Sequence, residues 1–301
     1  MLGNVPLRVI GGTARSPFGP GILHRMLLEF TKMHGAGNDF IVFDASADSR
    51  LPDAAAWRAL SHRQKGIGFD QALVIEPPRR AGTSAFYRIF NADGGEVEQC
   101  GNGARCVATY LRNRGNVAPG EIVMDSPAGL IRARIDAEGM VSVDMGTPNF
   151  DPKSLPFDAS AEAHVYPLAV AGTEVEIGAV SMGNPHAVLT VASVASAPVD
   201  RLGPAIERHP RFPKRVNVGF MEIVDKSHIK LRVFERGVGE TLACGTGACA
   251  AVAVGRRHGR LDATVEVELP GGKLEITFAA PGEHIWMKGP TAVSFIGRVE
   301  I

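Results

Sequence analysis

The sequence contains the stretch Cys100-Gly101-Asn102-Gly103-Ala104-Arg105-Cys106 and, 144 residues later, the similar stretch Cys244-Gly245-Thr246-Gly247-Ala248-Cys249-Ala250. Four further pairs of short stretches match in the same order, at offsets of 143 to 146 residues: Gly37-Asn38 with Gly183-Asn184, Arg88-Ile89-Phe90-Asn91 with Arg232-Val233-Phe234-Glu235, Pro127-Ala128-Gly129 with Pro270-Gly271-Gly272, and Met145-Gly146 with Lys288-Gly289. A repeat of this length indicates two related domains. The proline-rich segment 147–160 is the expected linker.

The composition excludes several classes of protein. The 301 residues include 32 Lys and Arg and 32 Asp and Glu, so the formal net charge is zero. Nucleic acids and anionic membrane surfaces favour basic partners, so neither is expected here. No apolar run approaches the roughly 20 residues that a membrane helix needs. The hydrophobic fraction of 45% is typical of a globular protein and too high for a disordered one.

Residues 1–25 differ from the rest of the chain, since they contain three arginines, no acidic residue and scattered glycine and proline. They could be a transit peptide, a disordered leader or the result of a mis-assigned start, with Met26 as the true initiator. We find no secretory signal peptide. The four cysteines therefore indicate a reducing cytoplasm, where they would be structural, metal-binding or catalytic.

Each repeat is expected to contain short strands and two helices. Alternating apolar and polar residues predict strands at 86–90, 130–135 and 141–145, and at 175–180, 229–234, 265–269 and 274–278. One helix is expected at 53–63 and its counterpart at 200–209, each with aspartate as N-cap. The other helix follows each cysteine stretch, at 103–114 and 247–257. The sequence therefore predicts an α+β protein.

The two stretches place Cys100 and Cys244 at the starts of the predicted helices. The free N–H groups and the dipole of a helix N-terminus favour an anion, so we expect a lowered thiol pKa and a carboxylate ligand nearby. Cys106 and Cys249 fall inside the helices and are expected to pack in the core. A zinc site or a redox dithiol would need cysteines or histidines at closer spacing, so no metal is expected.

Two related domains, each with one activated thiol, predict a cleft with a cysteine on either side. One thiolate could remove a proton from one face of a carbon while the opposite thiol protonates the other face. Helix N–H groups could stabilise the carbanion beside a carboxylate. The sequence thus points to stereoinversion without a cofactor.

The sequence resembles the diaminopimelate epimerase family in several long motifs. They are Lys32-Met33-His34-Gly35-Ala36-Gly37-Asn38-Asp39-Phe40, Gly66-Ile67-Gly68-Phe69-Asp70-Gln71, Phe90-Asn91-Ala92-Asp93-Gly94, the two cysteine stretches, Met182-Gly183-Asn184-Pro185-His186, and Glu235-Arg236-Gly237-Val238-Gly239-Glu240-Thr241-Leu242-Ala243 before Cys244. The resemblance covers residues 26–301.

The resemblance implies interconversion of LL- and meso-2,6-diaminopimelate for lysine and peptidoglycan precursors, without pyridoxal phosphate or a metal. It implies two pseudo-symmetric domains, each a barrel-like, mostly antiparallel sheet around a central helix. The family's last strand returns to the first domain, which gives residues 26–147 plus 290–301 for one domain and 148–289 for the other. A homodimer is also implied.

The resemblance further implies a set of site residues. Cys100 and Cys244 match the catalytic pair, and His186 and Glu235 would support catalysis. The residues that match the substrate-binding set are Asn38, Gln71, Asn91, Gly101, Asn102, Asn184, Asn217, Glu235, Arg236, Gly245 and Thr246. The residues that we expect to be structural are Asp39, Asp70, Asp93, Arg88 and Arg232.

Two alternatives remain open. One is a proline-racemase-like or phenazine-biosynthesis-like isomerase with the same architecture. The other is a thiol switch or binding protein, in which Cys100 and Cys244 form a reversible disulfide.

Overall fold

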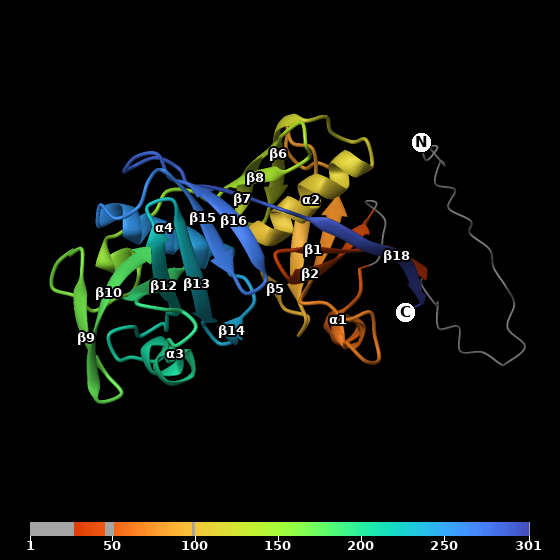
Figure 1. The fold of residues 1–301 in the computed structure, drawn as a ribbon. Coiled ribbons are helices and arrows are strands. Elements are labelled where there is room, and N and C mark those ends of the chain that lie inside the picture. The colour runs from red at the N-terminus through yellow and green to blue at the C-terminus, as the bar shows by residue number, and fades with distance from the viewer. Residues whose placement is uncertain (1–26, 46–50, 98–99, 301) are drawn as a thin grey trace, which may run out of the picture.

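The computed structural model describes residues 27–45, 51–97 and 100–300, so the predicted leader at 1–25 lies outside the described residues. Eighteen strands and four α-helices form two similar halves, seen as two lobes in Figure 1. All strands belong to one mixed sheet, in which most neighbours are antiparallel. Among the described residues, no helix has the length and apolar character needed to cross a membrane.

The first half contains strands β1 to β8. Antiparallel pairs dominate, while β2 and β3 run parallel, as do β4 and β6. The strands are β1 (Leu27–Gly35), β2 (Asn38–Asp44), β3 (Gln71–Glu76), β4 (Phe86–Asn91), β5 (Glu96–Val97), β6 (Gly120–Ser126), β7 (Gly129–Ile135) and β8 (Val141–Asp144).

The second half repeats this pattern, with β11 parallel to β12 and β13 parallel to β15. After the short 3₁₀ turn η1 (Pro152–Ser154), the strands are β9 (Tyr166–Val170), β10 (Thr173–Ser181), β11 (Pro185–Val191), β12 (Asn217–Asp225), β13 (His228–Glu235), β14 (Gly239–Thr241), β15 (Thr264–Leu269), β16 (Gly272–Thr277) and β17 (Trp286–Gly289). The repeat inferred from the two cysteine stretches is therefore confirmed as two related halves.

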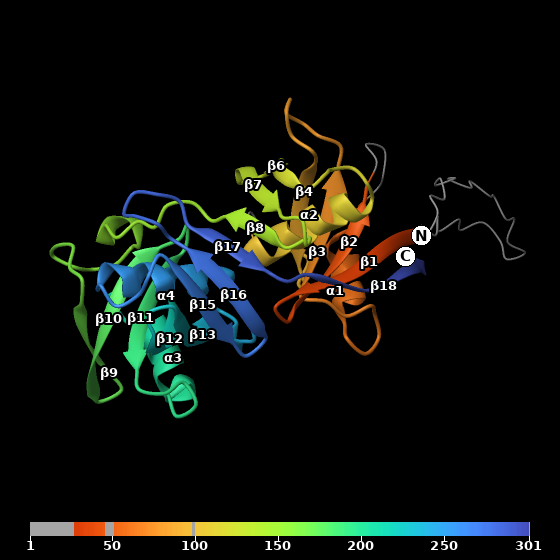
Figure 2. The same ribbon diagram turned by 45° about the horizontal axis from the view of Figure 1, so that its top comes forward.

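Two strand pairings join the halves. β8 pairs with β17 in antiparallel register. The last strand, β18 (Ala292–Glu300), leaves the second half and pairs with β1, with Leu27 opposite Glu300. Figures 1 and 2 both show β18 beside β1, although the two strands stand at opposite ends of the described chain.

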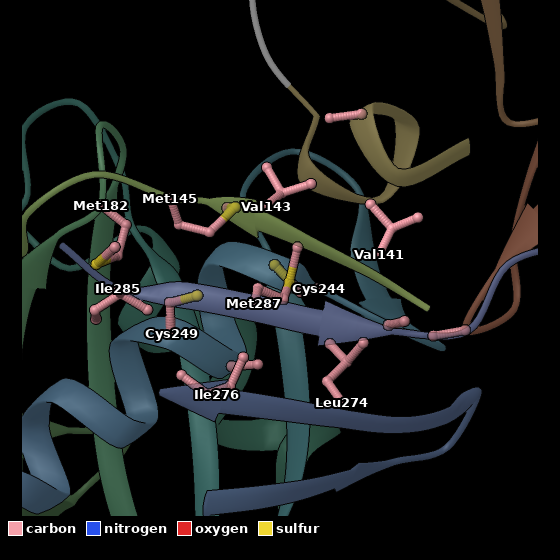
Figure 3. Packing of buried hydrophobic residues seen from close by; sticks show 14 of the residues in the cluster. Val141, Val143, Met145, Met182, Cys244, Cys249, Leu274, Ile276, Ile285 and Met287 are labelled. Atoms are coloured by element: carbon pink, nitrogen blue, oxygen red, sulfur yellow. The ribbon is translucent and has the colours of Figure 1, made fainter. Parts of the chain in front are cut away.

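A central helix lies inside each half, as predicted. Helix α2 (Gly101–Asn113) and helix α4 (Gly245–Arg257) each begin two residues earlier than the sequence indicated. Nearly all side chains of the first turns of α2 are buried, because strands surround the helix. Cys106 and Cys249 are fully buried, which confirms that they pack in the core. Figure 3 shows Cys249 and Cys244 near Met145 and Met287, where the two halves share one hydrophobic cluster.

The two outer helices are α1 (Ala54–Ser61) and α3 (Val199–Glu207). Asp53 caps α1 as predicted, since its carboxylate accepts the N–H of Ala56 at 2.8 Å. Asp200 does not cap α3. The chain enters that helix earlier, with Pro198 at the N-cap and Asp200 in the first turn, where its charge still suits the helix dipole.

Arg88 and Arg232 occupy equivalent positions and make equivalent ion pairs. Arg88 Nε lies 2.7 Å from Glu96 Oε1, and Arg232 Nε lies 2.6 Å from Glu240 Oε1. Each pair joins two neighbouring strands, which agrees with the structural role expected of these arginines.

Candidate active site

The two cysteines that lead the central helices differ in their contacts. Cys100 is the N-cap of α2, and its Sγ accepts the N–H of Gly103 at 3.4 Å. Cys244 is the N-cap of α4, but its Sγ makes no capping bond. That thiol instead donates to Oε2 of Glu235, 3.2 Å away on β13. The geometry thus joins one thiol to a helix terminus and the other to a carboxylate.

Both thiols line one cavity of about 730 Å3 between the two halves. The sequence-predicted residues that the structure brings together there are Cys100, Cys244, Asn38, Gln71, Asn91, Gly101, Asn102, Asn184, Glu235, Gly245 and Thr246. Gly101 and Asn102 begin α2, and Gly245 and Thr246 begin α4. Their backbone N–H groups therefore have no hydrogen-bond acceptor within the helix. A carboxylate placed between the helix starts could accept hydrogen bonds from both.

A series of side-chain amides surrounds the thiols. Asn38 lies 3.9 Å from Cys100 through its Oδ1, which also accepts from Asn102 Nδ2 at 3.4 Å. Across the cleft, Asn184 Nδ2 donates to Thr246 Oγ1 at 3.3 Å, and that hydroxyl lies 3.6 Å from Cys244 Sγ. Amides can both donate and accept hydrogen bonds, so these groups suit the ammonium and carboxylate groups of an amino acid.

Three predicted site residues do not line the cavity. Asn217 is buried on β12, where it donates to Pro185 O at 3.0 Å and accepts the N–H of Arg236 at 2.9 Å. The guanidinium of Arg236 donates to the Lys214 carbonyl at 3.3 Å. These contacts tie β11, β12 and the end of β13 together, behind the side chains that face the cleft.

The third is His186, which is 1% exposed and lies directly behind Asn184. Its Nε2 lies 3.0 Å from Asn184 Oδ1. Burial, with a smaller contribution from the charge of Arg236, lowers the pKa of His186 to about 3. The imidazole is therefore neutral at physiological pH, so it can orient Asn184 but does not carry a proton as imidazolium.

The sequence did not identify Arg63 as a site residue, yet it lines the cavity. Its guanidinium binds Asp39 at 2.8 and 2.9 Å and Asp70 at 2.7 Å. Burial acts to raise the pKa of Asp39, but hydrogen bonds from Arg63 and Lys32 outweigh this effect and lower that pKa to about 2. Asp70 in turn accepts from Asn38 Nδ2 at 2.8 Å. The ion network therefore orients Asn38, a residue that contacts Cys100.

Asp70 and Asp93, which we expected to be purely structural, also line the cavity. Both keep the turn contacts expected of them, since Asp93 accepts the N–H of Gly95 at 2.8 Å. Asp70 precedes β3 and Asp93 follows β4, and neither position in the sequence gave a sign that these side chains face a cleft. Arg63 has His209 at the equivalent position of the second half, so the repeat gave no sign of it either.

The expectation of lowered thiol pKa values is wrong. Burial, and to a lesser extent the charge of Glu235, raises the pKa of Cys100, although the Gly103 N–H bond and the charge of Arg105 act in the opposite direction. Burial also raises the pKa of Cys244 well above its ordinary value, and the Glu235 carboxylate raises it further. The sequence showed that each thiol stands at a helix N-terminus, which lowers a thiol pKa. It could not show how deeply the thiols are buried, which raises the pKa by more.

Glu235→Gln is expected to lower the pKa of Cys244, because it removes the negative charge that disfavours the thiolate. The Cys244 thiolate should then form at lower pH, which ultraviolet thiolate absorbance followed against pH in a Cys100→Ser background would measure. Glu240→Gln is the matched control, because Glu240 also lines the cleft but pairs with Arg232. An unchanged titration in the Glu235 variant would contradict the assigned Cys244–Glu235 interaction.

Comparison with known proteins agrees with this fold. Residues 30–150 and 178–293 match the family model described as diaminopimelate epimerase. Curated relatives of that name come from Thioalkalivibrio sulfidiphilus, 54% identical over 280 residues, and Alkalilimnicola ehrlichii, 52% identical over 278 residues. Each alignment covers 92% of this chain and 100% of the relative. A solved hydroxyproline epimerase from Agrobacterium vitis has the same fold at 16% identity, with a TM-score of 0.66 over 91% of this chain and 93% of that one.

The fold and these relatives define an isomerase of the class in which epimerases and racemases are built from two repeated domains. Within this class, the chain belongs to the diaminopimelate epimerase family. The family resemblance inferred from the sequence motifs is therefore confirmed.

Proposed function

We propose that this protein interconverts LL- and meso-2,6-diaminopimelate with two cysteines acting as acid and base. The observation that carries the proposal is that Cys100 and Cys244, at the starts of two pseudo-symmetric helices, line one cleft. The family match and the 54% identity to a curated diaminopimelate epimerase support the choice of substrate.

The reaction we propose is a proton exchange at one carbon. The thiolate of one cysteine takes the α-proton, the electron pair stays on the α-carbon and its carboxylate, and the thiol of the other cysteine returns a proton to the opposite face. The N–H groups of Gly101, Asn102, Gly245 and Thr246 would hold that carboxylate and stabilise its growing charge. The chain's own side chains supply each step, so the mechanism needs no pyridoxal phosphate and no metal.

The remaining predicted residues would hold the rest of the substrate. Asn38, Gln71, Asn91 and Asn184 line the cleft and could bind the amino and carboxyl groups. Glu235 would accept an ammonium hydrogen or tune Cys244, and His186 would keep Asn184 in place. Arg236 remains our candidate for the distal carboxylate, which requires its guanidinium to leave the Lys214 carbonyl. Asn217 would hold the backbone of Arg236 during that movement.

The decisive experiment is a coupled epimerase assay on LL-diaminopimelate in heavy water without added cofactor. We expect formation of the meso isomer and entry of deuterium at the inverted carbon. Activity on proline with none on diaminopimelate would favour a proline-racemase-like enzyme. Reversible oxidation of the cysteines without isomerase activity would favour a thiol switch. Either result would contradict the proposal.

The setting we propose is the cytoplasm, in lysine and peptidoglycan precursor synthesis. All four cysteines are free in the structure, and a thiol mechanism requires them to remain reduced. We also retain the predicted division into domains at 26–147 plus 290–301 and at 148–289, which the pairing of β18 with β1 supports.

We further propose a homodimer formed through β18. Among the described strands, β18 has its register with β1, and its other edge carries no strand from the described part of the chain. Exposed apolar side chains gather along these two strands at Leu27, Val293, Phe295 and Ile296. Open edges and contiguous apolar patches are features of interfaces, and a second copy could cover both through a two-fold contact.

Phe295→Asp is expected to convert the dimer into a monomer, because it puts a charge in the apolar patch. Sedimentation velocity at several protein concentrations would measure the change. Leu130→Asp is the matched control, since Leu130 is also an exposed apolar residue but lies on β7. A dimer that persists in the Phe295 variant and dissociates in the control would overturn the assignment of this surface.

A further inference from the structure

Arg105 is a buried cation that the proposed mechanism does not use. Its side chain lies on α2, five residues after Cys100, and is 0% exposed. None of its three guanidinium nitrogens makes a hydrogen bond within the part of the chain that the structure describes. A buried charge without a partner is costly, because the charged form loses its hydration. A negative charge nearby would therefore stabilise the buried guanidinium.

The guanidinium lies where the two halves meet. A Cβ built on Gly35, at the end of β1, would stand 3.3 Å from Arg105 Nη2. A Cβ on Gly289, at the end of β17, would stand 3.3 Å from both Nε and Cζ. Two glycines from different halves thus leave the space that the guanidinium fills. The same Cβ on Gly35 would stand 3.7 Å from Asn102 O, in the first turn of α2, so the guanidinium lies near the start of its own helix.

Among the described residues, the charged groups that act on the pKa of Arg105 are thiols, with Cys106 first, then Cys100 and Cys249. Cys100 and Cys106 are on its own helix and Cys249 is on α4. Cys106 and Cys249 are fully buried in the apolar core, and burial raises the pKa of each to about 12. Cys100 also lines the cleft, so it is the thiol of the three that can exchange its proton with solvent or substrate.

The repeat makes the asymmetry of the site clear. The offset of 144 residues places Cys249 at the position equivalent to Arg105, and Glu235 at the position equivalent to Asn91. The first half therefore has a cation and a neutral amide where the second half has a neutral thiol and an anion. The Cys100 thiol interacts with Arg105 and Cys106 on α2, Tyr87 on β4 and Glu235 on β13, whereas the Cys244 thiol contacts Glu235 and Thr246.

We propose that Arg105 is a positioning residue that makes the two active-site thiols unequal, so that Cys100 is the first to ionise and Cys244 keeps its proton. Cys100 then loses its proton to solvent and its thiolate balances the buried guanidinium. The S–H of Cys244 remains bound to Glu235. The inference rests on the proposed two-thiol function, because it names which thiol begins as base and which as acid.

The pKa shifts agree with this order. At Cys100, burial and the charge of Glu235 raise the pKa, while the Gly103 N–H bond and the charge of Arg105 oppose them. At Cys244, burial is again the largest cause, and Glu235 adds to it both through its charge and through its hydrogen bond with the thiol, so the pKa is raised well above its ordinary value. Burial lowers the pKa of the Arg105 guanidinium itself, but arginine remains protonated in proteins. The cation is therefore present at every pH at which the enzyme would work.

The test is the alkylation rate of Cys100 by iodoacetamide against pH, resolved by peptide mass spectrometry in the full-length protein. The midpoint of the profile reports ionisation, and the plateau at high pH reports access to the thiol. Arg105→Met should move the midpoint to higher pH by about one unit and slow alkylation at neutral pH about tenfold. Arg105→Lys should keep a profile near that of the wild type, because it keeps the charge.

Arg112→Met is the matched control, since it removes a positive charge from the last turn of the same helix. Its midpoint should not move. Circular dichroism checks folding, and Arg105→Gln replaces Arg105→Met as the neutral variant if the latter does not fold. An unmoved midpoint in a folded neutral variant, or an equal shift in Arg105→Lys, would overturn the inference. The alkylation profile is measured without substrate, so a failure of this inference can be told apart from a failure of the proposed epimerase activity.

Discussion

Replacing Cys100 or Cys244 by alanine is expected to slow epimerisation of diaminopimelate by about 100- to 10,000-fold, the usual contribution of a general acid or base. Both losses should be similar in size, because each turnover needs one thiolate and one thiol. The coupled assay in heavy water would measure both rates. If both variants epimerise at the rate of the unaltered protein, the two-thiol mechanism is wrong.

The other two cysteines provide matched controls within the same helices. Cys106→Ala and Cys249→Ala remove thiols of the same kind that are fully buried in the core. Each should cost about 1 kcal/mol of stability, typical of a point mutation, and leave the rate close to that of the unaltered protein. A large loss of activity in these variants would show that cysteine loss disturbs the helices themselves.

Gly271→Val is expected to lower kcat/KM about 100-fold, because it would force the two halves apart at the edge of the cleft. A Cβ at Gly271 would lie 2.3 Å from the backbone oxygen of Ala36, in the turn between β1 and β2. It would also lie 3.0 Å from the oxygen of Leu242. Backbone atoms cannot rotate away as a side chain can. Leu242 itself lines the cavity, as does Gly37, which follows Ala36, so the displacement would reach the site.

The repeat supplies the control for this variant. Ala128 occupies the equivalent turn in the first half and is exposed, so Ala128→Val places the same side chain in the matching turn without contact between the halves. Steady-state kinetics and circular dichroism should find this variant folded and active. Full activity in Gly271→Val would mean that the two turns can separate without moving the residues that line the cleft.

The sequence predicted the repeat, the two central helices and the cysteine at the start of each. This was possible because glycine spacing and helix capping are local properties of the chain. The same local rules fail where entry into a helix depends on its surroundings, as at α3, which Pro198 begins in place of Asp200. Two of the eleven predicted substrate-binding residues, Asn217 and Arg236, do not line the cavity in the structure.

Burial and long-range contacts were beyond the reach of the sequence. The thiol pKa values depend on how deeply the helix starts lie, which no local pattern records. The guanidinium of Arg63 is held at the cleft by hydrogen bonds to Asp39 and Asp70, which are 24 and 7 residues away in the chain. The pairing of β8 with β17 also joins segments that the repeat had assigned to separate domains. The family resemblance, by contrast, identified nine of these eleven residues and both cysteines at the cleft.

The position of β18 has a consequence for synthesis of the protein on the ribosome. β1 is among the first strands to emerge, yet its partner β18 is made only after every strand of the second half. Closing so long a loop is slow, and an unpaired strand edge favours aggregation until it closes. β1 therefore cannot complete its pairing until the second half has been made. A chaperone that covers β1 would increase the yield of folded protein more than one that acts on the second half.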